Sequence, residues 1–214
     1  MSSRIRKVAV TGGPCSGKTT FLERATRTAR AAGWDVYPIE EPATKLIKDG
    51  LPIKEALRTG NIPLIYACER RITRWCLDVR HQTLRHIRVN GRGKKAVIIY
   101  DRGIPDNFAY MPEGPEGEEM YLNILRETSH QPQEILAMYD AVIKLTTAAI
   151  GAPRFYSLSN NEARTEELAE AIRLDRRIDI AYAAHPMKFV IDNSTDFEKK
   201  MERALAAFTH VLNS

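Results

Sequence analysis

The chain has 214 residues, 43% of them hydrophobic and 28% charged, which excludes a disordered polymer and predicts one globular domain spanning residues 1–214. The net charge is +5, but no dense Lys/Arg tract occurs, so the charge argues against nucleic acid as a partner. Three cysteines without C-x-x-C spacing argue against a disulfide framework or a zinc site. No apolar stretch reaches the roughly 18 residues of a membrane span, and we expect a cytoplasmic, soluble protein.

The first motif lies between an apolar run, residues 8–11, and a helical pattern over residues 18–32. Its sequence, GGPCSGKT, matches the G-x-x-x-x-G-K-[ST] phosphate-binding loop in a strand–loop–helix context. The glycines let backbone N–H groups surround a phosphate, and we predict that Lys18 reaches the β- and γ-phosphates while the Thr19 hydroxyl binds Mg²⁺. The predicted nucleotide-binding residues of this segment are Gly12, Gly13, Pro14, Cys15, Ser16, Gly17, Lys18, Thr19 and Thr20.

Residues 34–39 are predicted to form a second strand, which Pro42 ends. The preceding Glu40-Glu41 pair lies where a second substrate would enter. A carboxylate there can accept the proton of an attacking hydroxyl, and we favour Glu41 because Pro42 fixes the backbone after it. An outer-shell role toward Mg²⁺ and a solvated loop remain as alternatives at this position.

Short helices are expected at 43–48 and 53–58, followed by a long helix that begins after Asn61. Residues 96–100 form the strongest strand pattern of the chain, and Asp101 follows it. A carboxylate at the end of the strand beside the phosphate-binding strand is the Walker-B position, so we predict that Asp101 binds Mg²⁺. Arg102 is interpreted either as a ligand of the transferred phosphoryl group or as a surface ion pair. Asp106 and Tyr110 are expected near the acceptor.

Further elements are expected at 118–129, 132–138, 140–146, 164–183 and 188–192. A C-terminal helix follows them, and we predict that Thr195 and Glu198 form its capping box. The helix over 164–183 is rich in charge, and Arg173 and Arg177 lie four residues apart on one face. We predict a lid at about 147–184 that brings these arginines onto the phosphates; a salt-bridged surface helix is the alternative. Asn193 is placed to contact the nucleotide base. The charged residues that give this helix its alternating pattern include Arg164, Arg173, Arg176, Arg177, Glu166, Glu167, Glu170 and Asp175.

Strands alternate with helices along the whole chain, which predicts a parallel sheet with helices on both faces. Ligands of such sheets bind beyond the carboxyl ends of the strands. The loops that follow each predicted strand should therefore meet at one edge and form one site.

These motifs together resemble a P-loop nucleoside/nucleotide kinase, and within that group the NadR/TRPL-translocation-defect-like family of AAA ATPase/kinase domains. The resemblance implies a three-layer P-loop NTPase fold, with a five-stranded parallel sheet of order 2-3-1-4-5 and a kinase-like helical lid. Some relatives resemble nicotinamide riboside kinases, and others look like GTP- and phosphoinositide-binding trafficking proteins. The segments that carry the resemblance are 11–20, 101–103, 155–158, 160–164, 185–186 and 190–198.

The sequence predicts Mg²⁺-dependent binding of ATP, with GTP as an open alternative, and phosphoryl transfer to a small hydroxyl-bearing metabolite such as a nucleoside-like compound. The second hypothesis is a nucleotide-switched regulatory NTPase with slow hydrolysis, which binds a phosphoinositide or a protein. The acceptor and the oligomeric state stay open. The residues expected to act in catalysis are Lys18, Glu41, Asp101, Arg102, Arg173 and Arg177.

Overall fold

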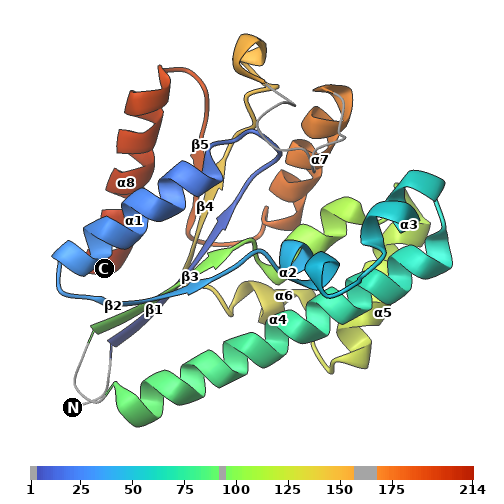
Figure 1. Cartoon of the computed structure of the whole chain (residues 1–214), viewed down its shortest axis with the longest axis horizontal. Coiled ribbons are helices and arrows are strands. Elements are labelled where there is room, and N and C mark those ends of the chain that lie inside the picture. Colours follow the sequence, from blue (N-terminus) through green and yellow to red (C-terminus); the bar gives the residue numbers. More distant parts are fainter. Residues whose placement is uncertain (1–3, 92–94, 157–167) are drawn as a thin grey trace.

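A computed structural model of the protein describes residues 4–91, 95–156 and 168–214. Its centre is a five-stranded parallel sheet of order β2-β3-β1-β4-β5 (Figure 1). The predicted strand order 2-3-1-4-5 and the three-layer α/β architecture are therefore confirmed. The strands are β1 (Arg4–Thr11), β2 (Asp35–Ile39), β3 (Lys95–Asp101), β4 (Ala141–Leu145) and β5 (Lys188–Ile191).

Helices cover both faces of the sheet, and each face has its own apolar core (Figure 1). Val8 and Val10 of β1 face the core under α1 and α8, whereas Ala9 faces the opposite core, as the two-residue period of a strand requires. Phe21 of α1 meets Phe208 of α8 edge to face, with ring centroids 6.2 Å apart. The helices are α1 (Lys18–Ala31), α2 (Pro42–Lys48), α3 (Ile53–Thr59), α4 (Ile62–Asn90), η1 (Ile104–Tyr110), α5 (Pro115–Glu127), α6 (Pro132–Leu136), η2 (Pro153–Phe155), α7 (Leu168–Ala181) and α8 (Phe197–Asn213).

A third, smaller apolar cluster joins α2 and α3 to the first half of α4. The predicted N-cap of α4 is confirmed, since the Asn61 side chain accepts a hydrogen bond from the Leu64 N–H at 3.1 Å. This cluster places the segment after β2 beside the carboxyl ends of the strands, where the site forms.

Three local expectations differ from the structure. The 3₁₀ helix η1 was not expected, because its Pro105 and short polar residues read as a loop. Helix α5 begins at Pro115 rather than at residue 118, since proline fits the first turn of a helix. The N-cap of α8 is Asp196, whose carboxylate accepts from the Lys199 N–H at 2.8 Å, so the predicted Thr195 cap is wrong. In the parts of the chain that the structure describes, no helix combines the length and hydropathy of a membrane span.

Candidate functional site

The loop between β1 and α1 has the backbone that a phosphate cradle needs. Gly12 has φ of 143°, and a Cβ there would lie 2.0 Å from the Leu145 carbonyl oxygen, so only glycine fits. Gly17 adopts the left-handed conformation at φ 92° and begins α1 without a side-chain cap. The first N–H groups of α1 therefore point out of the helix toward the cleft, ready to receive an anion.

Lys18 lies at the wall of this cleft. Its Nζ donates to the carbonyl oxygens of Gly12 at 2.9 Å and Gly13 at 3.2 Å. Desolvation at the wall, together with the positive charge of Arg102, lowers the pKa of Lys18 to about 8. The negative charge of a bound triphosphate would favour the charged form of Lys18 and would therefore raise its pKa again.

A buried ion pair supports the loop from behind. Asp175 of α7 accepts a hydrogen bond from the Gly13 N–H at 3.0 Å and another from the Thr147 N–H at 3.0 Å. Its second oxygen binds Lys144 Nζ of β4 at 2.5 Å, and both side chains are at least 95% buried. This carboxylate thus ties β4, α7 and the phosphate-binding loop together.

A second buried lysine connects α8 to the same loop. Lys200 Nζ donates to the carbonyl oxygens of Ser16 at 2.9 Å and Thr146 at 2.7 Å, and to Asn193 Oδ1 at 2.7 Å. The Asn193 amide nitrogen in turn donates to the carbonyl oxygens of Thr147 and Ile150 at 2.8 and 2.6 Å. Asn193 lines the cleft, but these bonds use its amide to hold the loops together rather than to present it to a base.

The predicted strand-end residues meet on the other side of the loop. β3 lies beside β1 with Asp101 in register with Val10, which is the expected Walker-B position. Arg102 adopts φ 69°, and its Nε donates to Glu41 Oε1 at 2.5 Å. Its Nη1 donates to Asp106 Oδ1 at 3.1 Å, so this ion pair is buried rather than at the surface.

Asp106 is the centre of this cluster. Its Oδ1 also accepts from the Thr11 hydroxyl of β1, and its Oδ2 accepts from the Gly103 N–H at 2.9 Å and the Tyr182 hydroxyl at 2.7 Å. These bonds fix the strand end and the start of η1, and they hold the Arg102 guanidinium toward Glu41.

The two remaining carboxylates differ in their electrostatics. Burial alone would raise the pKa of Glu41, but Arg102 and Lys18 outweigh it and hold the pKa at about 2. Burial raises the pKa of Asp101, an effect that Lys18 partly offsets, and Asp101 Oδ1 is buried without a hydrogen-bond partner among the described residues. An unpaired carboxylate oxygen in the cleft that the threonine at the start of α1 also lines suits a hard cation, so Asp101 and Thr19 could hold Mg²⁺. No group of three or more His, Cys, Asp or Glu in the described ranges could hold a metal ion; Mg²⁺ bound with a nucleotide needs only one or two protein ligands.

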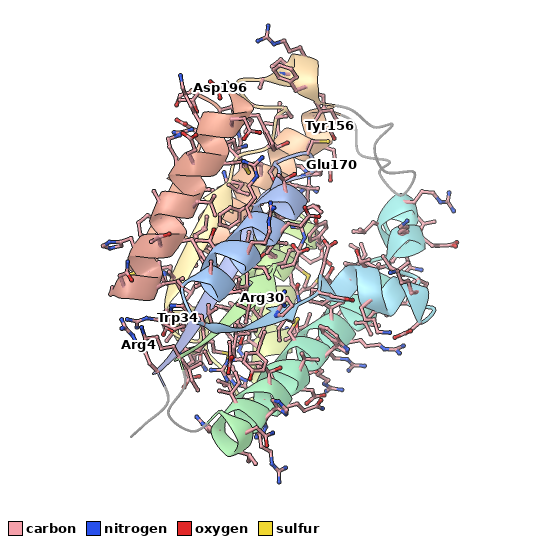
Figure 2. The ribbon with its side chains drawn as sticks, turned by 60° about the vertical axis from the view of Figure 1, so that its left-hand side comes forward. Arg4, Arg30, Trp34, Tyr156, Glu170 and Asp196 are labelled. Atoms are coloured by element: carbon pink, nitrogen blue, oxygen red, sulfur yellow. The ribbon has the colours of Figure 1, made fainter. Side chains whose placement is uncertain are left out.

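A cleft of about 2100 Å³ runs along this edge of the sheet. Figure 2 labels Glu170 and Asp196, which line the cleft, at the end of the molecule opposite Arg4. Besides the phosphate-binding loop, two further sets of segments line the cleft. We call them the 148–155 wing, which also includes residues 193–200, and the 41–72 wing, which also includes residues 101–110.

The arginines of the predicted lid have separate positions. Arg173 lines the cleft, where its guanidinium forms two 2.6 Å hydrogen bonds to Glu170 and one of 3.4 Å to Glu113. Arg177 does not line the cleft: it donates to the Phe108 carbonyl at 2.8 Å and packs over the Phe108 ring at 4.8 Å. Arg164 lies outside the described residues. α7 is thus packed firmly on η1, and only Arg173 of the described arginines reaches the cleft from this helix.

The fold and the loop together define a P-loop NTPase. A family model described as "AAA domain" matches residues 7–200, which is most of the chain. The chain belongs to this family of AAA domains and is a nucleotide-binding domain of the P-loop NTPase class. A comparison with curated proteins returned no match.

Sequence reasoning missed three residues that support the phosphate-binding loop, Asp175, Lys144 and Lys200, and it also missed Glu69, which lines the cleft. Lys144 had a visible signal, since it is the one charged residue inside the apolar run of 141–145. A lysine at the centre of a buried strand requires a buried partner, and an acidic residue on a neighbouring helix is the natural candidate.

Proposed function

We propose that the protein transfers the γ-phosphoryl group of ATP to a hydroxyl group of a small metabolite, with a nucleoside-like compound as the favoured class. The observation that carries the proposal is the continuity of the cleft: it runs from Lys18 and Thr19 of the phosphate-binding loop into a wing lined by Glu41, Arg102 and Asp106. An NTPase that only hydrolyses its nucleotide needs room for water, whereas this wing has room for a second molecule. The resemblance to NadR-like domains agrees with the proposal, and a cytoplasmic location goes with it.

In this proposal the triphosphate lies on the loop, with Lys18 on its β- and γ-phosphates. Thr19 and Asp101 would hold Mg²⁺, which supplies charge neutralisation between the β- and γ-phosphates when bound. The acceptor oxygen forms a bond to the γ-phosphorus while the bond from that phosphorus to the bridging oxygen breaks, and the diphosphate leaves. Arg102 and Arg173 stabilise the charge on the transferred group.

Glu41 orients the acceptor hydroxyl by accepting its hydrogen bond. With a pKa of about 2, this carboxylate is ionised at neutral pH and is a weak proton acceptor. That suits phosphoryl transfer, because its loose transition state demands positioning of the nucleophile more than early removal of the proton. The proton is then released to a phosphoryl oxygen or to solvent.

The test is a screen of purified protein for transfer of labelled phosphate from ATP and from GTP to a panel of nucleosides and vitamins. We expect at least one labelled acceptor, and no label with Lys18→Ala. Tight binding of ATP with no acceptor labelled across the panel would contradict the proposal.

A second function is favoured by one observation, the bond between Asp175 of α7 and the Gly13 N–H of the loop. A change in the loop between diphosphate and triphosphate would reach α7 through this bond, as a nucleotide-switched regulatory NTPase requires. Co-sedimentation with vesicles containing phosphoinositide, in the presence of ADP or of a non-hydrolysable ATP analogue, tests this alternative. Equal binding in both states would exclude phosphoinositide switching.

A further inference from the structure

Glu69 of α4 is a buried acid that none of the site's described functions uses. Its exposed fraction is 2%, and its Oε2 is buried without a hydrogen-bond partner among the described residues. It nevertheless lines the cleft, in the 41–72 wing. Buried carboxyl oxygens in folded proteins are almost always paired, and an unpaired one costs free energy. The missing partner is therefore expected from a molecule bound in the cleft.

Near Glu69 the wall of this wing includes apolar side chains of α3 and α4, and charged side chains line other parts of the wing. Ile72, one turn further along α4, and Ile53 of α3 line the same wing and belong to the small cluster of α2, α3 and α4. On the η1 side, Asn107 also lines the cleft, but its Nδ2 is used by Thr73 Oγ1 at 2.9 Å. Such a wall suits the flat ring of a ligand, with Glu69 as the polar group that fixes its orientation.

The protonation state of Glu69 decides which ligand group it can bind. Burial raises the pKa of Glu69 to about 8, and Arg102 opposes this only in part. At neutral pH the side chain is therefore mostly a neutral carboxylic acid. It then presents an O–H donor beside a carbonyl acceptor, rather than two acceptors as a carboxylate does.

We propose that Glu69 is the specificity residue of the acceptor site, and that it pairs with a lactam or amide edge of the acceptor, in which an uncharged N–H donor stands beside a carbonyl acceptor. The inference rests on the proposed phosphoryl transfer for the assignment of this wing to the acceptor. A neutral acid and a lactam form two parallel hydrogen bonds, so each group satisfies the other. The unpaired Oε2 obtains its partner in this way.

The first experiment measures binding of uridine and inosine by calorimetry, with Mg²⁺ and a non-hydrolysable ATP analogue present. Both probes carry hydroxyl groups and a lactam edge, and 3-methyluridine is the matched probe without the N–H donor. For the wild type we expect N3-methylation to weaken binding about tenfold or more. Glu69→Gln, which also has a donor beside an acceptor, should retain uridine binding. Glu69→Leu should weaken uridine binding and remove the difference between the two uridines.

The second experiment repeats the uridine titration from pH 6 to pH 8.5, a range in which the N3–H of uridine itself stays protonated. Ionisation of Glu69 removes its donor, so wild-type affinity should fall as the pH rises through about 8, while Glu69→Gln should show no such fall in that range. Glu23→Gln, an exposed acid of α1, is the control that should follow the wild type. The other titratable and charged groups near Glu69 or along this wing are Glu41, Lys54, Glu55, Arg58, Cys68, Cys76, Asp101, Arg102, Asp106 and Tyr110.

Three results would overturn the inference: no binding of either nucleoside, no effect of N3-methylation, or a loss with Glu69→Gln as large as with Glu69→Leu. The last result would mean that the uridine N–H donates to an ionised Glu69 carboxylate rather than pairing with a neutral acid. Failure of the inference and failure of the proposed function are distinguishable. If lactam binding depends on Glu69 but no phosphate is transferred, only the kinase proposal is contradicted. If acceptors are labelled equally well with and without Glu69, only the inference is contradicted.

Discussion

Asp175 on α7 and Gly13 in the phosphate-binding loop are joined by a hydrogen bond of 3.0 Å between a carboxylate oxygen and a backbone N–H. The carboxylate is 1% exposed and is also the partner of Lys144 in the centre of the sheet. The Asp175 side chain therefore holds both the phosphate-binding loop and α7 in position relative to the sheet.

Removal of this carboxylate should destabilise the whole domain. Asp175→Ala leaves Lys144 buried and uncompensated, and we expect the free energy of unfolding in urea to fall by about 3 to 5 kcal/mol. The double variant Lys144→Met/Asp175→Leu should recover part of the loss, because no buried charge remains. If the single variant is as stable as the wild type, the buried pair does not exist in solution.

Lys18 should decide nucleotide affinity without supporting the fold. Lys18→Ala removes a charged donor worth about 1.5 to 3 kcal/mol, so ATP affinity measured by calorimetry should fall about tenfold or more. The melting temperature without nucleotide should change little. Lys45→Ala, an exposed lysine of α2 outside the cleft, is the matched control and should bind ATP as the wild type does.

The neighbouring residues Glu41 and Glu40 provide a test of whether Glu41 positions the acceptor hydroxyl. Glu41 lines the cleft and binds Arg102, whereas Glu40 is exposed and does not line it. For the labelled acceptor, Glu41→Gln should lower kcat by about 10², the cost of a misplaced nucleophile, with ATP binding retained. Glu40→Gln should have wild-type kcat. Equal effects of the two variants would remove Glu41 from the reaction.

Asp101 should set the requirement for Mg²⁺. Asp101→Asn is expected to raise the Mg²⁺ concentration needed for half-maximal activity by about tenfold or more, since a neutral amide is a weaker ligand. Because burial raises the pKa of Asp101, Mg²⁺ affinity in the wild type should also fall as the pH is lowered, and this fall should be absent from the variant. A Mg²⁺ titration of ATP turnover at several pH values measures both effects.

Glu69 should make the unliganded protein less stable as the pH rises. Its pKa is about 8 in the folded chain against an ordinary 4.5, so the folded state binds more protons between these values. Stability linked to this group is complete below pH 4.5 and is lost as the pH rises toward 8, on the order of 3 kcal/mol by pH 7. Urea unfolding of Glu69→Gln should lack this loss. Parallel pH curves for the variant and the wild type would show that Glu69 titrates normally.

The sequence alone was sufficient to predict the site residues that follow the ends of strands. The phosphate-binding loop, Glu41, Asp101 and Arg102 each come directly after an apolar run, and the parallel sheet brings such positions to one edge. The same alternation of strands and helices, with the family resemblance, was sufficient for the strand order.

Residues in the middle of helices could not be found in this way. Glu69 lies in α4 among many charged residues that a helical pattern assigns to solvent, and its burial depends on α3 and η1, which approach from elsewhere in the chain. Asp175 was placed among the charged residues of a helix interpreted as a lid or, alternatively, as a salt-bridged surface helix, for the same reason. The position of Arg177 against the Phe108 carbonyl likewise depends on η1, an element that the sequence pattern did not reveal.

The division of the cleft into two wings has a consequence for how such a domain can change its substrate. Most of the wall of the 41–72 wing comes from one continuous segment, α2, α3 and the first part of α4, which carries its own small apolar cluster. Replacement of this segment would alter the wall of the proposed acceptor site while leaving the loop, Asp175 and Lys200 in place. Chimeras joined near residues 41 and 75 would therefore change the ligand bound by this wing separately from the phosphate-binding loop.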